Sequence, residues 1–186
     1  MSRLFIASLL LITALLISAC VREKEEQSQI KAVVVRYNQL VAECYRTHNM
    51  NLMQEAANRE QAEKLYIHMA AIGEGQLRME STLKDIAFKK IALPKPDQAT
   101  VETKEVWDFT YVDIKANRVF YQEKDFIYEM GYTLGKINGR WIVTNVVTVS
   151  GTSTNAVVPW PEIDRKGNRS YPAGQGPENS KPVGHP

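Results

Sequence analysis

The sequence predicts an α+β domain in which N-terminal helices pack on a curved antiparallel sheet of about four strands, a cone-shaped roll with a disordered C-terminal tail. Apolar residues recur every three or four positions between 30 and 72, and the spacing falls to two from Leu83. Six of the eight prolines lie at or beyond Pro159. A chain of 186 residues allows one domain plus tails. Its core is large enough for the domain to fold without disulfide bonds or a structural metal.

Composition and charge narrow the class of partner. The chain is 44% hydrophobic and 24% charged, with a formal net charge of +2. Because no acidic or basic bias indicates nucleic acid, we expect no such partner. His48 and His68 lack neighbours at metal-ligand spacing, and no phosphate-binding glycine loop or nucleophile motif occurs. We therefore expect neither a metal nor another cofactor.

The N-terminus has the pattern of a lipoprotein signal peptide over residues 1–19. Arg3 supplies the positive start, an apolar segment follows over 4–17, and a small Ser-Ala pair precedes Cys20. Fourteen positions are fewer than the roughly 20 that a membrane-spanning helix needs. We therefore expect cleavage before Cys20, whose thiol can take a diacylglyceryl group through a thioether.

The acylated cysteine would place the protein in the cell envelope. Each buried CH₂ contributes ~0.8 kcal/mol, so several acyl chains anchor a protein almost permanently. Val21 stands where an aspartate marks retention at the inner membrane in many Gram-negative bacteria. By this resemblance we expect an outer-membrane position facing the periplasm. Residues 20–29, mainly charged or polar, are expected to form a short tether.

The periodic segment 30–72 predicts amphipathic helices. Asn49 or Asn51 can cap the second of them, because asparagine accepts from free backbone N–H groups. Cys44 lies on the apolar stripe of the first, so we expect a small core residue with an inert thiol and no disulfide to Cys20. The expected helices span 30–45, 52–57 and 62–72, with 76–79 as a last turn or a connection.

From Leu83 the period of two is typical of strands. The segment from Pro94 to Asp97 is expected to end the first strand, because proline donates no backbone hydrogen bond. Asn138-Gly139 is the residue pair favoured at a tight hairpin turn. The expected strands span 83–92, 98–112, 125–136 and 140–149, with 117–124 as a partly extended connection.

The domain is expected over 30–150 and a Pro/Gly-rich disordered tail over 151–186. Trp160 and Tyr171 are the aromatic residues of the final proline-rich stretch. They are expected to be either part of an inert tail or a short docking segment.

The segment from Tyr132 to Val146, YTLGKINGRWIVTNV, resembles the final hairpin of the nuclear transport factor 2-like superfamily. The order and lengths of the helices over 30–149 resemble lipoprotein and Tim44-like or intermembrane-space-type members. The resemblance implies the fold, but it carries no catalytic residue onto this chain. Asp108 and Asp113 flank Tyr111 on the face opposite the apolar one, and no hydrolase-type arrangement is evident.

Glu105 is the exception on an otherwise apolar strand face. The odd positions of 98–112 point to one side of the sheet, and we expect this side to face inward. A carboxylate there needs a partner or a raised pKa if it is buried, which makes it a candidate site. Alternatively, Glu105 reaches solvent at a bulge or rim, or pairs with a lysine or arginine.

Aromatic residues of three strands share the predicted inner face. Together they would line a cone whose mouth could hold an apolar ligand or an extended segment; alternatively, the rings simply fill the core. With Glu105, the candidate binding residues are Trp107, Tyr111, Tyr128 and Tyr132.

Two functions fit these features. The first is a non-catalytic, lipid-anchored module that binds an envelope protein or another copy of itself through the sheet face or the cone mouth. The second is a carrier of, or an enzyme on, a small apolar molecule held beside Glu105. A merely structural spacer lipoprotein is a third possibility.

Lipidation is tested by feeding cells labelled palmitate. We expect the label to enter the protein, which should no longer start at Met1, and we expect Cys20→Ser to abolish incorporation. Cys44 is retained in that variant, so loss of label would assign the acyl chains to Cys20. Unlabelled protein that still starts at Met1 would contradict the prediction.

Overall fold

The computed structural model describes residues 2–176, with side chains described over 23–176. Its helices precede a sheet of long antiparallel strands, which confirms the α+β class. The helices are α1 (Ser2–Thr47), the 3₁₀ helix η1 (Met50–Glu55) and α2 (Arg59–Glu74). The strands are β1 (Leu77–Lys95), β2 (Gln98–Asp113), β3 (Arg118–Ile137), β4 (Arg140–Thr152), β5 (Asn155–Val158), β6 (Glu162–Ile163) and β7 (Arg169–Ser170).

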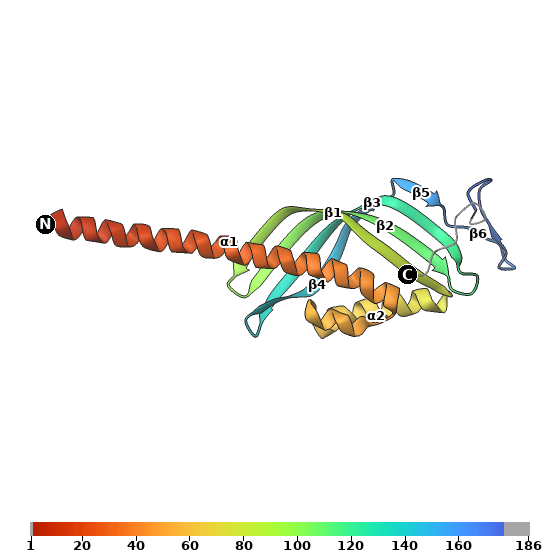
Figure 1. Cartoon of the computed structure of the whole chain (residues 1–186), viewed down its shortest axis with the longest axis horizontal. Helices are drawn as coiled ribbons and strands as arrows, with labels where there is room; N and C mark the ends of the chain where they lie inside the picture. Colours follow the sequence, from red (N-terminus) through yellow and green to blue (C-terminus); the bar gives the residue numbers. More distant parts are fainter. Residues whose placement is uncertain (1, 177–186) are drawn as a thin grey trace.

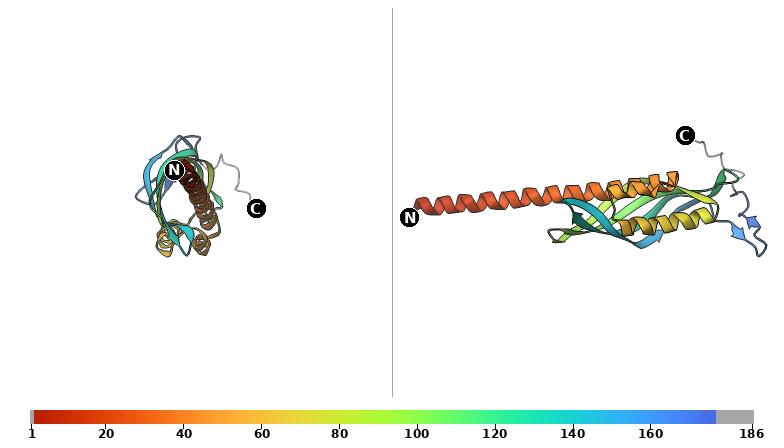
Figure 2. Two further views of the ribbon diagram at one scale, coloured as in Figure 1. Left: turned by 90° about the vertical axis from the view of Figure 1, so that its left-hand side faces the viewer. Right: turned by 90° about the horizontal axis from the view of Figure 1, so that it is seen from below.

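The main sheet has the order β1-β2-β3-β4. The short β5 pairs with β3 near the start of that strand, on the edge that pairs with β4 farther along. Register shifts interrupt the ladders, for example between Leu83 and Asp85 and between Phe88 and Lys90 in β1. Such bulges bend strands and increase their twist. The long strands therefore curl, and α1 and α2 lie on the concave side (Figures 1 and 2).

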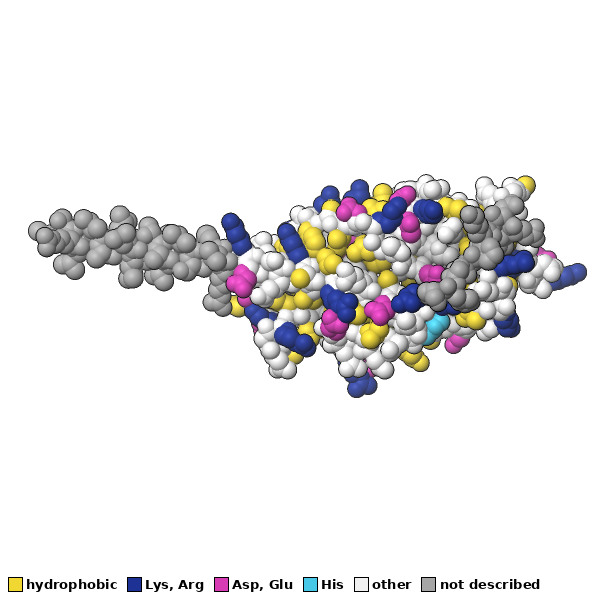
Figure 3. Space-filling view, in the orientation of Figure 1, with side chains coloured by type: hydrophobic (Ala, Val, Ile, Leu, Met, Phe, Trp, Pro, Cys, Tyr) yellow, Lys and Arg dark blue, Asp and Glu magenta, His cyan; other side chains and the backbone are white. Residues whose placement is uncertain are grey.

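The core lies between α1 and the sheet. The apolar stripe of α1 is buried as predicted, with Ile30, Val34 and Cys44 fully inaccessible. Against it pack small and branched side chains of the sheet, including Val101 and Leu134. Between α1 and β1, apolar side chains also reach the surface on the face shown in Figure 3, with charged side chains around them.

The predicted hairpin between β3 and β4 is present. Asn138 and Gly139 both have positive φ, 51° and 78°, which is the backbone that a two-residue turn of this type requires. The turn fixes the register, with Ile137 opposite Arg140.

The predicted tether over 20–29 is part of α1 in the structure. Near its end, the Glu26 carboxylate accepts hydrogen bonds from Lys136 Nζ and Trp141 Nε1, both at 2.6 Å. These two hydrogen bonds hold α1 against the turn end of the β3–β4 hairpin. The boundary of the domain therefore moves toward the N-terminus. The side chain of Cys20 lies outside the described residues.

Two expected connections are strands. For 76–79 we expect a last helical turn or a connection, yet β1 begins at Leu77. The segment 117–124, expected to be a partly extended connection, is almost wholly within β3. Val119, Phe120 and Tyr121 are all buried, so both faces of β3 are covered there. A strand covered on both faces lacks the alternation that identifies strands in a sequence.

The predicted disordered tail also begins too early at 151. β5 pairs with β3 at Gln122 and Val158, and the Tyr171 hydroxyl donates to the Phe120 carbonyl at 3.1 Å. The first part of the tail thus extends the sheet along one edge of β3, while Trp160 and Arg169 pack on the ring of Phe120. These contacts explain why that stretch of β3 is buried. Residues 177–186 lie outside the described part of the chain.

Candidate functional site

A cavity of about 460 Å³ lies between α1, α2 and the concave face of the sheet. The structure brings the five predicted site residues, Glu105, Trp107, Tyr111, Tyr128 and Tyr132, together on its walls. The aromatic rings therefore line a hollow as well as filling the core. That these residues bind a ligand stays a prediction.

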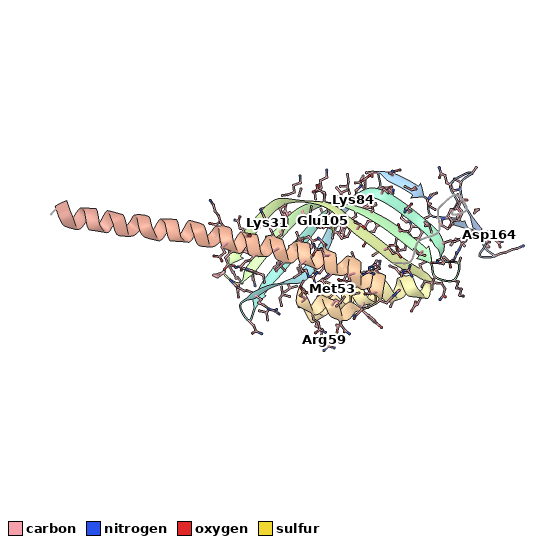
Figure 4. The ribbon with its side chains drawn as sticks, in the orientation of Figure 1. Lys31, Met53, Arg59, Lys84, Glu105 and Asp164 are labelled. Carbon is pink, nitrogen blue, oxygen red and sulfur yellow. The ribbon has the colours of Figure 1, made fainter. Side chains whose placement is uncertain are left out.

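Glu105 is 1% exposed and lies inside the curve of the sheet beside α1 (Figure 4). Its Oε1 accepts from Tyr132 OH at 2.6 Å, Thr103 Oγ1 at 2.7 Å and Asn38 Nδ2 at 3.1 Å. Its Oε2 accepts from Trp107 Nε1 at 2.9 Å. The carboxylate is therefore surrounded by four neutral donors.

This arrangement differs from both structural alternatives considered for Glu105. The carboxylate is not at a solvent-exposed rim, and among the described residues no lysine or arginine bonds to it. Sequence reasoning missed the donor on α1. Asn38 follows Val34 by four positions, on the buried stripe of the helix, and an amide at such a position is a signal for a buried polar partner.

The hydroxyl of Tyr132 links the two halves of this network. It donates to Glu105 and accepts from Asn38 Nδ2 at 3.0 Å. Burial, followed by the neighbouring Glu105 carboxylate, raises the pKa of Tyr132 well above its ordinary value. The phenol therefore keeps its proton and remains a donor at any physiological pH.

Two polar atoms on the cavity wall have no hydrogen-bond partner among the described residues, Gln61 Oε1 and Ser81 Oγ. Gln61 is only 4% exposed, and its Nε2 donates to Tyr37 OH at 2.8 Å. Buried polar atoms are nearly always satisfied, because an unmade hydrogen bond costs about 1–3 kcal/mol. Both atoms are themselves buried, so neither presents a surface to the cavity.

His68 of α2 also lines the cavity, on its exposed side. Its Nδ1 lies 2.7 Å from Tyr45 OH. Burial of part of the ring lowers the pKa of His68 below its ordinary value of 6.5, so the imidazole is mainly neutral near pH 7. Among the described residues, no group of three or more His, Cys, Asp or Glu side chains could hold a metal ion.

Trp160 forms one end of the cavity, although its sequence neighbours suggested a tail. Its ring stacks on Tyr121 with centroids 4.4 Å apart and lies 5.1 Å from the ring of Tyr111. The side chain is 50% exposed. Of the two predicted outcomes for this tryptophan, the structure gives a docked segment, but one that docks on its own domain.

A second buried carboxylate lies behind this end of the cavity. Glu123 is 1% exposed and accepts from the hydroxyls of Tyr121 and Ser153 and from the backbone N–H groups of Thr154 and Asn155. Burial raises the pKa of Glu123, but these hydrogen bonds outweigh burial, so the pKa lies below its ordinary value. Glu123 thereby fastens the segment after β4 to β3.

With this geometry known, the chain can be compared with other proteins. No protein-family model matches the sequence, and a search of curated proteins gives no match. Within the part of the chain whose side chains are described, no helix is long and apolar enough to cross a membrane.

The chain can also be superposed on solved structures. The intermembrane space region of the chloroplast protein ARC6 superposes with a TM-score of 0.56 at 12% identity, over 66% of this chain and 95% of that one. An NTF-2 like protein of unknown function from Shewanella oneidensis MR-1 gives 0.42 at 16% identity, over 63% and 97%. A putative scytalone dehydratase from Novosphingobium aromaticivorans DSM 12444 gives 0.42 at 12% identity, over 81% and 95%. The first of these likenesses shows that this chain and the ARC6 region share a fold.

The lowered pKa of Glu123 predicts an acid-dependent contribution to stability. The unfolded chain binds this proton more tightly than the folded one, so the contribution is complete above the ordinary pKa of 4.5 and is lost as pH falls through the folded value. At neutral pH we expect Glu123→Gln to lower the free energy of unfolding by about 1–3 kcal/mol.

Urea unfolding at several values between about pH 7 and about pH 3 measures this difference. We expect the gap between the native protein and Glu123→Gln to narrow toward acid. Glu129→Gln, an exposed position of the same strand, controls for removal of a charge. A difference in unfolding free energy that stays constant across this pH range would contradict the lowered pKa of Glu123.

Proposed function

We propose that this chain is a lipid-anchored envelope protein that binds a small, largely apolar molecule in its cavity. The observation that carries the proposal is the cavity itself, whose volume of about 460 Å³ falls within the range of about 300–1,000 Å³ that is usual for ligand pockets. An aromatic lining with few polar groups is the usual composition of such sites.

The position of the predicted anchor suits this role. If Cys20 carries the acyl chains, the helix rise of about 1.5 Å per residue puts it roughly 25 Å along α1 from Tyr37, where the cavity begins. The N-terminal part of α1 extends away from the sheet (Figure 1). The cavity would then be held clear of the lipid surface and accessible from the periplasm.

We propose binding in preference to catalysis. Both oxygens of Glu105 are occupied by donors, so this carboxylate is not poised as a general base. The pair of His68 and Tyr45 is joined by a hydrogen bond, so the phenol and this imidazole nitrogen already satisfy each other.

A second candidate function is assembly through β4. Val147 and Val149 share one face of this edge strand and are 53% and 68% exposed. Exposed apolar residues on an unpaired sheet edge favour pairing with another strand. An envelope protein or a second copy of this chain would fit there.

Native mass spectrometry of the detergent-extracted full chain tests both functions in one measurement. We expect the monomer mass to carry one additional small molecule, and a dimer mass or a captured protein if β4 serves assembly. Ser81→Phe should fill the cavity and lower ligand occupancy at least about tenfold. Ser28→Phe, on the exposed surface of α1, is the matched control and should retain the ligand.

Ligand-free protein from the native host, or equal occupancy in Ser81→Phe and Ser28→Phe, would contradict the binding proposal. A strictly monomeric protein with no captured partner would contradict the assembly candidate.

A further inference from the structure

We infer that the ligand is an organic cation, a molecule with an apolar body and a positively charged nitrogen. This inference rests on the proposed binding function and names the class of molecule that the same cavity takes. Two properties of the cavity walls support it: their aromatic surface and the sign of their charge.

The first property is the aromatic surface. Ten of the 21 residues that line the cavity are Phe, Tyr or Trp. They form a connected band: Phe109 stacks on Trp107 and meets the rings of Phe126 and Tyr128 at steep angles. The faces of aromatic rings carry partial negative charge and attract cations within about 6 Å. A pocket walled by several such faces is an aromatic cage.

The second property is the charge behind the rings. Glu105 lies in the wall at one end, and Glu123 lies behind Tyr121 at the other. Their immediate hydrogen-bond donors are neutral, so the hydrogen bonds stabilise each carboxylate without cancelling its charge. Among the described residues, no lysine or arginine lines the cavity. Because both carboxylates are buried, their charge is screened less than it would be in water.

His68, which also lines the cavity, adds no opposing charge near pH 7, because burial lowers its pKa. Both properties therefore disfavour an anion.

A pair of probes that differ only in charge tests the inference. Acetylcholine carries a trimethylammonium group, and 3,3-dimethylbutyl acetate has the same shape with carbon in place of nitrogen. Calorimetry on the detergent-solubilised full chain gives both affinities, and fluorescence of Trp107 and Trp160 reports occupancy at the site. We expect the cation to bind at least about tenfold more tightly than its neutral counterpart.

Two variants distinguish the contribution of the carboxylate charge from that of the aromatic rings. Glu105→Gln keeps an acceptor but removes the charge, and we expect it to weaken acetylcholine binding about tenfold more than binding of the neutral probe. Glu129→Gln removes an exposed charge and should leave the preference intact. If Glu105→Gln fails to fold, Trp160→Leu at the half-exposed end of the cage still tests the inference. We expect this variant to have a smaller preference for acetylcholine over the neutral probe.

Equal affinity for the two probes would overturn the inference and leave the proposed binding function standing. Absence of binding by both would overturn the inference as well, and the proposed function would then be decided by the native mass spectrum. If the Glu105→Gln and Trp160→Leu variants both kept the full preference for acetylcholine over its neutral counterpart, the aromatic cage would be contradicted.

Discussion

The structure depends on one buried carboxylate. Glu105 receives hydrogen bonds from α1, β2 and β3, through Asn38, Trp107 and Tyr132 among others. Burying a charge costs several kcal/mol unless it is well hydrogen-bonded, so the helix and the two strands are held in the one arrangement that supplies these donors. The same donors leave the charge without a counter-ion, and this determines the electrostatics of the cavity.

The cavity follows from how the surrounding elements are shaped. The bulged sheet bends away from α1, and α2 covers only part of the concave side (Figure 2). Large rings on β2 and β3 pack against each other edge to face, as Phe109 does with Phe126 and Tyr128, so they support one another and do not collapse inward. The segment after β4 then adds Trp160 and closes one end. Glu123 holds that segment in place through three hydrogen bonds, from Ser153 Oγ and from the backbone N–H groups of Thr154 and Asn155.

Local patterns in the sequence predicted much of this arrangement. The helical period identified the buried stripe from Ile30 to Cys44, the Asn138-Gly139 pair identified the hairpin, and alternation along β2 placed Glu105 inside. Each of these follows from the geometry of a single element or a single turn. The five candidate site residues share one cavity because they occupy the inner faces of neighbouring strands.

Other features depend on contacts between distant segments, which a single sequence does not encode locally. Burial of both faces at the start of β3 removes the alternation that identifies a strand, because the cover of Phe120 comes from Trp160 and Arg169, far along the chain. The docking of Glu26 on Lys136 and Trp141 joins positions more than a hundred residues apart. The donors around Glu105 could be guessed from Asn38 on the apolar stripe, but their convergence required the fold.

A double-mutant cycle between Asn38→Leu and Tyr132→Phe tests the central claim most directly, namely that the Glu105 network acts as a unit between helix and sheet. Each substitution removes one donor, and each should lower the free energy of unfolding by about 1–3 kcal/mol. If the network is a unit, the two effects are coupled by about 0.5–3 kcal/mol. Effects that add to within about 0.3 kcal/mol would show that the two donors act independently and would contradict the account.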